Sequence, residues 1–130
     1  MEARAGEAPA QEEQQTVKQY DIIWANMPAP IGRRPVLLLT RTAAFDYLNN
    51  VIVVEVSSTI RGIAQEVPLG TREGLRQRSV ANCDNMHVVP KRLLGEKIGV
   101  LPASRIWEIK RALGYALDWA ELKVQQAASR

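Results

Sequence analysis

Residues 32–40 read Gly32-Arg33-Arg34-Pro35-Val36-Leu37-Leu38-Leu39-Thr40, an apolar run that follows two arginines and a proline. The run is short, rich in valine and leucine and bounded by turn residues, which predicts a buried β-strand. Pro35 fixes its own φ and disfavours helical geometry at Arg34, so Arg34 is held extended where the strand begins. A guanidinium held in this way is suited to bind a phosphate or a carboxylate. Two arginines before a strand are also compatible with ordinary solvated flanking residues.

Further strand-like segments surround this run, at residues 19–27, 51–57, 64–69, 79–89 and 97–101. Residues 51–57 carry the strongest signal because β-branched side chains dominate them. A period of two places Val51, Val53, Glu55 and Ser57 on one face of that strand. We expect a kink or bulge in residues 79–89 around Cys83-Asp84-Asn85, and a short helix within residues 41–50.

The pattern changes after Pro102, where apolar residues recur at helical spacing and predict a helix that ends near Glu121. Residues 1–16 are rich in Ala, Glu and Gln without sustained periodicity, which predicts a disordered acidic lead-in. We expect one domain over residues 17–121 and a frayed tail over 122–130. Several short strands and one terminal helix predict a small, mainly β barrel with an α-helical ending.

The composition is that of a globular protein, since 46% of the 130 residues are hydrophobic, 24% are charged and the net charge is +3. Acidic residues are concentrated in the first thirteen positions, so the remainder is more basic and compatible with a polyanionic partner. One cysteine and one histidine allow no intrachain disulfide and do not suffice for a typical zinc site. Because no apolar stretch reaches bilayer length and the first residues do not resemble a signal peptide, we expect a cytoplasmic protein without membrane contact.

Five segments, in order, resemble motifs of the MazF/PemK family of toxin endoribonucleases from toxin–antitoxin modules. They are Tyr20-Asp21-Ile22-Ile23-Trp24, the 32–40 run with its Arg-Pro pair, Val53 to Ser58, Ser79 to Val89, and Ile98-Gly99-Val100-Leu101. Each motif alone is weak, but their common order and spacing make a fairly specific signal over residues 18–120.

The resemblance implies an SH3-like small barrel of the plasmid-maintenance-toxin type that forms a homodimer. It implies sequence-selective, metal-independent cleavage of single-stranded RNA by the substrate 2′-hydroxyl, leaving a cyclic phosphate and a free 5′-hydroxyl. No cofactor is expected. The expected partner is a cognate antitoxin whose acidic, disordered segment folds over the RNA site.

Two residues match the catalytic positions of the family. Arg34 matches the arginine before the proline, and a held guanidinium there would stabilise the negative charge that develops on the phosphoryl oxygens. Ser57 occupies the position of the catalytic threonine, where a hydroxyl would orient the scissile phosphate; capping a turn at the strand end is its alternative role. Ser58 is the alternative hydroxyl, because a one-residue slip in register exchanges the two faces of a strand.

Four further residues are candidates for the site. Glu55, where the family carries small or apolar residues, could pair with the arginine or accept a proton, or could be an exposed strand residue. Arg33 is a candidate backbone-phosphate contact. Asn85 and His87 are candidate RNA-binding residues, with a structural role as the alternative for His87.

The main departure from the family is the short first loop, Pro28-Ala29-Pro30-Ile31-Gly32. Many members carry a longer loop here that covers the RNA, so we expect a target sequence unlike that of long-loop members. Two alternatives to a ribonuclease remain on the same fold. One is a non-enzymatic toxin acting on DNA gyrase, as in the CcdB family, and the other is a degenerate member that only binds RNA or an antitoxin.

Overall fold

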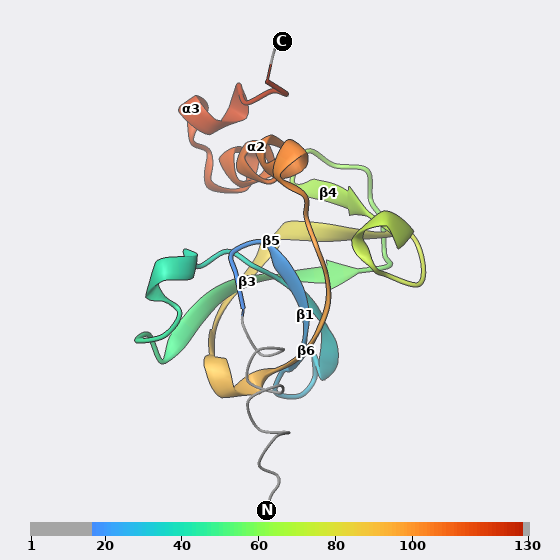
Figure 1. The fold of residues 1–130 in the computed structure, drawn as a ribbon. Coiled ribbons are helices and arrows are strands. Elements are labelled where there is room, and N and C mark those ends of the chain that lie inside the picture. Colours follow the sequence, from blue (N-terminus) through green and yellow to red (C-terminus); the bar gives the residue numbers. More distant parts are fainter. Residues whose placement is uncertain (1–16, 129–130) are drawn as a thin grey trace, which may run out of the picture.

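The computed structural model describes residues 17–128, so the acidic lead-in predicted for residues 1–16 lies outside the described residues. The described residues form one six-stranded antiparallel sheet followed by two helices (Figure 1). The strands are β1 (Asp21–Asn26), β2 (Arg33–Leu38), β3 (Asn50–Ser57), β4 (Glu66–Leu69), β5 (Ser79–Pro90) and β6 (Leu94–Val100). The helices are α2 (Ile106–Leu117) and α3 (Ala120–Lys123), and four 3₁₀ turns connect the elements: η1 (Thr42–Ala44), η2 (Thr71–Glu73), η3 (Lys91–Leu93) and η4 (Ala103–Arg105).

The strands follow one another across the sheet in the order β4-β5-β3-β2-β1-β6. The sheet curls on itself, and α2 covers the end formed by β4 and β5 (Figure 1). Within the described residues no ladder joins β4 to β6; instead the η2 turn, which follows β4, packs against β6. The predicted mainly β barrel with a C-terminal helix is therefore confirmed.

A bulge in β5 bends the sheet where the sequence predicted a kink. Val54 of β3 faces Met86, whereas the next residue, Glu55, faces Asn82, so residues 83–85 have no counterpart on β3. Extra residues in one strand increase the local twist. The bulge marks where β5 stops pairing with β4: residues 80–82 pair with both β3 and β4, whereas residues 86–90 pair with β3 alone.

Alternation along the strands divides the buried residues between two clusters. One cluster lies between the sheet and α2 and includes Leu37, Val54, Val56 and Ile109. The other lies on the opposite face and includes Val36, Leu38, Val51 and Val53. Burial on both faces explains why β2 reads as a continuous apolar run rather than an alternating one.

The C-terminal helix is shorter than its periodicity predicts. It ends at Leu117, because Asp118 takes a left-handed conformation (φ 57°), and α3 then folds back against α2. A side chain at Gly114 would lie 2.7 Å from the backbone nitrogen of Lys123, so glycine permits this close return. The predicted end near Glu121 is therefore wrong, and the first residues of the expected tail belong to α3. Among residues 17–128, no helix is long and apolar enough to cross a membrane.

Candidate active site

The two arginines that precede Pro35 point to opposite faces of β2. The guanidinium carbon of Arg33 lies 3.9 Å from the centroid of the Trp24 ring. Arg34 Nη1 instead donates a hydrogen bond to Glu55 Oε1 on the neighbouring strand, at 3.2 Å. Successive residues in an extended strand project to opposite sides, so Arg33 stacks on an aromatic ring of β1 while Arg34 pairs with a carboxylate of β3.

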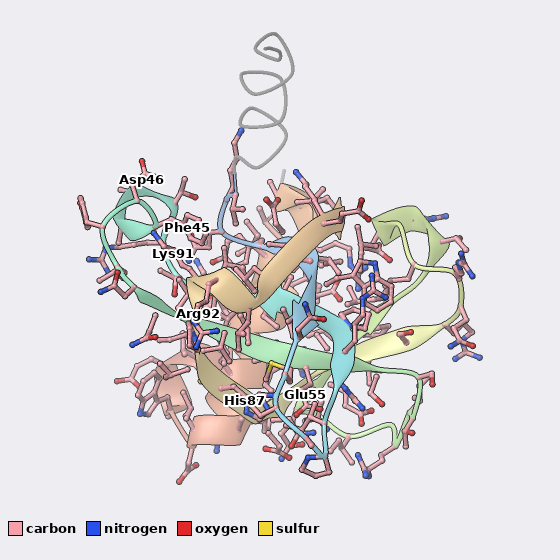
Figure 2. The ribbon with its side chains drawn as sticks, turned by 90° about the horizontal axis from the view of Figure 1, so that it is seen from below. Phe45, Asp46, Glu55, His87, Lys91 and Arg92 are labelled. Carbon is pink, nitrogen blue, oxygen red and sulfur yellow. The ribbon has the colours of Figure 1, made fainter. Side chains whose placement is uncertain are left out.

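Arg34, Glu55 and His87 form a linked group across three adjacent strands, which we call the Glu55 cluster. His87 Nε2 lies 2.5 Å from Glu55 Oε2, so each carboxylate oxygen of Glu55 faces one basic partner. Figure 2 shows Glu55 and His87 side by side, and the Glu55 side chain is only 11% exposed. A carboxylate engaged at both oxygens and largely removed from water is well suited to hold its partners in place.

The register of β2 against β3 relates Arg34 to Ser57. Val36 faces Glu55, Leu37 faces Val54 and Leu38 faces Val53. If this β2–β3 register is extended by two residues, Arg34 lies opposite Ser57, and both side chains are on the same face of the sheet. This alignment favours Ser57 over Ser58 as the hydroxyl beside the arginine.

Ser57 also caps the turn that leaves β3, which was its alternative role. Its Oγ accepts a hydrogen bond from the backbone N–H of Thr59 at 3.0 Å. A hydroxyl that accepts one hydrogen bond still has its own proton to donate. Capping the turn is thus compatible with donating a hydrogen bond to a phosphate oxygen.

A pocket of about 620 Å³ opens where these strands end. Its lining includes Arg33, Arg34, Ser57 and Ser58, together with residues from β1, β6 and the loop after η2. Among the described residues that line it, four are cationic (Arg33, Arg34, Arg76 and Lys97) and none is acidic. Such a pocket attracts an anionic ligand.

Three of the lining residues, Arg76, Gln77 and Lys97, had no signal in the sequence. Lys97 comes from β6, and its Nζ lies 3.2 Å from the buried carboxylate of Asp21 on β1. Arg76 and Gln77 come from the loop between β4 and β5. Arg76 and Gln77 lie near Arg34 because the sheet curls, which brings together segments that are about forty residues apart in sequence.

The remaining candidates do not line the pocket. Asn85 is exposed in the β5 bulge, and Glu55 and His87 belong to the Glu55 cluster, of which only Arg34 lines the pocket. Burial, followed by the nearby Asp84 carboxylate, raises the pKa of the Cys83 thiol to about 12, so Cys83 stays protonated at neutral pH and does not act as a nucleophile. Within residues 17–128, no group of three or more His, Cys, Asp or Glu side chains is placed to hold a metal ion.

Arg34 retains hydrogen-bonding capacity beyond its contact with Glu55. Its Nε is buried and has no hydrogen-bond partner among residues 17–128. An unsatisfied buried donor is costly, on the order of 1–3 kcal/mol. Glu55 engages only Nη1, and the Arg34 side chain is 33% exposed at the pocket, so the guanidinium can still donate to a phosphate there.

Known proteins similar to this chain share both its sequence and its fold. Endoribonuclease MazF3 of Mycobacterium tuberculosis is 46% identical over 88 residues, which cover 66% of this chain and 85% of that protein. The structure of Mycobacterium tuberculosis toxin MazF-mt6 matches with a TM-score of 0.72 at 41% identity, covering 75% of this chain and 96% of that one. An endoribonuclease in complex with its cognate antitoxin, from a mycobacterial species, has the same fold at 24% identity, with a TM-score of 0.69 and coverage of 79% of this chain and 96% of that one.

The family model of the PemK-like, MazF-like toxin of type II toxin–antitoxin systems matches residues 18–117, which contain all six strands and α2. The matched region includes Arg34, Ser57 and the complete pocket lining. With that match and a relative at 46% identity, the chain belongs to the PemK-like, MazF-like toxin family of type II toxin–antitoxin systems.

Proposed function

We propose that this protein is a sequence-selective endoribonuclease toxin that cleaves single-stranded RNA without a metal ion. The observation that carries the proposal is Arg34, which borders a cationic pocket beside Ser57 while Glu55 holds one of its nitrogens. Curated relatives named as endoribonucleases support it, and the family match favours it over a gyrase-directed toxin of the same fold.

In the proposed reaction, the substrate 2′-oxygen attacks the adjacent phosphorus and the bond from phosphorus to the 5′-oxygen breaks. The 2′-hydroxyl loses its proton and the leaving 5′-oxygen gains one, so the products are a 2′,3′-cyclic phosphate and a 5′-hydroxyl. Negative charge develops on the phosphoryl oxygens, where the Arg34 guanidinium stabilises it. The Ser57 hydroxyl orients the phosphate for in-line attack.

The direct test is incubation of the purified chain with RNA in EDTA, followed by analysis of both product ends. We expect cleavage at a limited set of sequences, with 5′ ends that accept phosphate from polynucleotide kinase without prior phosphatase treatment. Binding of RNA without turnover would instead identify a degenerate member of the family. Inhibition of gyrase supercoiling without RNA cleavage would support the gyrase alternative.

Replacement of Ser57 separates its hydroxyl from the rest of its side chain. Ser57→Ala removes the hydrogen bond to the phosphate and should lower kcat by about 10- to 100-fold, since one hydrogen bond to a charged group contributes about 1.5–3 kcal/mol. Ser57→Thr keeps the hydroxyl and should retain wild-type activity within a few-fold. Single-turnover cleavage of one RNA oligonucleotide measures both. Equal rates for the alanine variant and the wild type would assign Ser57 to the turn alone.

Glu55 acts as a positioning residue rather than as a proton acceptor, because Arg34 and His87 already engage its two oxygens. Glu55→Gln keeps the shape but removes the charge, and should lower kcat by about 10-fold without changing the shape of the pH profile. Glu96→Gln, an exposed change on β6, is the matched control. A loss above about 100-fold together with disappearance of one limb of the pH profile would instead identify Glu55 as the proton acceptor.

The other candidates complete the proposed site and its partners. Arg33 contacts the RNA backbone, and His87 and Asn85 contact RNA beyond the pocket.

The working form is a cytoplasmic homodimer, and light scattering would report twice the chain mass. A cognate antitoxin binds this dimer and covers the cationic pocket. Loss of antitoxin binding in Arg76→Ala, at unchanged dimer mass, would support that covering, whereas unchanged binding would place the antitoxin elsewhere.

A further inference from the structure

We propose that Arg76 and Gln77, in the loop between β4 and β5, are the residues that read the base next to the cleaved phosphate. This inference rests on the proposed ribonuclease function and names the source of its sequence selectivity. Both side chains are exposed, and both line the pocket that Arg34 and Ser57 also line. A residue that selects sequence must reach the same bound nucleotide as the residues that act on its phosphate.

The loop is anchored on both sides of these two residues. On one side, Leu75 is buried in the core cluster that faces α2 and its N–H donates to Gly70 O at 3.1 Å. On the other side, Ser79 is buried and its Oγ donates to Gln77 O at 3.1 Å. Arg76 and Gln77 therefore project from a short span held at both ends, which limits the backbone entropy lost when this loop binds a ligand.

Buried polar contacts fix the first half of the loop to the helical layer. Glu73 is buried, and its carboxylate accepts hydrogen bonds from Gly70 N–H at 2.6 Å and from Arg105 Nη1 at 2.8 Å. Arg105 Nη2 also donates to Pro68 O at 2.7 Å. This network ties β4, η2 and the start of α2 together, so the tip carrying Gln77 is presented by a rigid support.

The chemistry of the pair suits base recognition. A glutamine amide carries both donors and acceptors, and arginine presents a planar fork, so the two can form paired hydrogen bonds with base edges. Single-stranded RNA exposes those edges and also stacks on guanidinium planes. Arg33 lies on the Trp24 ring within the same pocket, so the guanidinium that contacts the RNA backbone is held beside Arg76 and Gln77.

The loop between β1 and β2 is poorly placed for this task. None of residues 27–32 is among the described residues that line the pocket. The loop after η2 thus supplies the polar side chains that the short first loop does not bring to the phosphate site.

The test is cleavage of a randomised RNA library by the wild type, Arg76→Ala and Gln77→Ala, with all cut sites sequenced. We expect each variant to lower the preference for its favoured base at a single position by about 10-fold, as loss of one paired hydrogen-bond contact predicts. Arg72→Ala, on the same loop but outside the pocket lining, and Gln126→Ala, beyond α3, are the matched controls and should keep the wild-type preference. Thermal melting of each variant verifies that it is folded, and Gln77→Glu replaces Gln77→Ala if the alanine variant is not.

The possible results separate the inference from the proposed function. Cleavage by the wild type with an unchanged preference in both pocket variants overturns the inference and leaves the ribonuclease intact. A uniform decrease at all sequences also overturns it, because it assigns Arg76 and Gln77 to the RNA backbone. Absence of cleavage by the wild type contradicts the proposed function itself, and the inference is overturned with it.

Discussion

Arg34→Ala is expected to lower the rate of RNA cleavage by about 100-fold or more, the usual effect of removing one donor that stabilises an oxyanion. Arg34 borders the pocket, and Glu55 holds its Nη1. Removing it eliminates the only group in the proposed mechanism that stabilises charge on the phosphoryl oxygens. Arg34→Lys keeps the charge without the fork and should recover only part of the rate.

Arg92→Ala is the control for this experiment, because Arg92 is exposed in η3, outside the pocket lining. Both variants should bind RNA more weakly in proportion to the lost charge, but only Arg34→Ala should lose single-turnover rate at saturating RNA. Equal single-turnover rates for Arg34→Ala and the wild type would remove Arg34 from the reaction and require another source of charge stabilisation.

Gly99→Ala is expected to destabilise the fold by about 1–3 kcal/mol, the usual effect of forcing extra volume into a packed contact. A Cβ at Gly99 would overlap the carbonyl oxygen of Glu73 and lie 2.7 Å from its carbonyl carbon. Both atoms belong to the backbone of η2, which packs against β6 where no β4–β6 ladder forms. With an alanine at position 99, η2 would have to move away from β6. Urea denaturation measures the resulting change in unfolding free energy.

Gly95→Ala provides a matched comparison on the same strand. A Cβ at Gly95 would lie 3.6 Å from Trp24 O, an ordinary van der Waals contact, so this variant should change the unfolding free energy by less than about 0.5 kcal/mol. If both glycine variants unfold at the same urea concentration, the close approach of η2 to β6 does not contribute to stability as described.

Local sequence patterns predicted most of the fold because they reflect local physics. The β-branched run from Val51 to Val56 predicted β3, and the polar interruption at residues 83–85 predicted the bulge in β5. The end of α2 was not predicted, since the apolar stripe continues past it to Ala120. The left-handed Asp118 and the close contact of α3 at Gly114 depend on how the chain returns on itself, which helical periodicity does not encode.

The site was only partly predictable for a related reason. Arg34 and Ser57 were found by their resemblance to family motifs, and the β2–β3 register places them on one face; their catalytic roles remain predictions. The link between Glu55 and His87 required the pairing of β3 with β5. Gln77 and Lys97 reach the pocket through long-range closure of the sheet, and their local sequence gives no sign of it.

The central claim, cleavage by the substrate's own 2′-hydroxyl at a phosphate held by Arg34, is tested most directly with one modified RNA. An oligonucleotide containing the mapped cleavage site is made with a single 2′-deoxy nucleotide on the 5′ side of the scissile phosphate. The unmodified RNA should be cut to a 2′,3′-cyclic phosphate, and the modified RNA should be bound but left intact. Cleavage of the modified RNA at the same bond and a similar rate would contradict the account, because the attacking group would then have to come from water or from the protein.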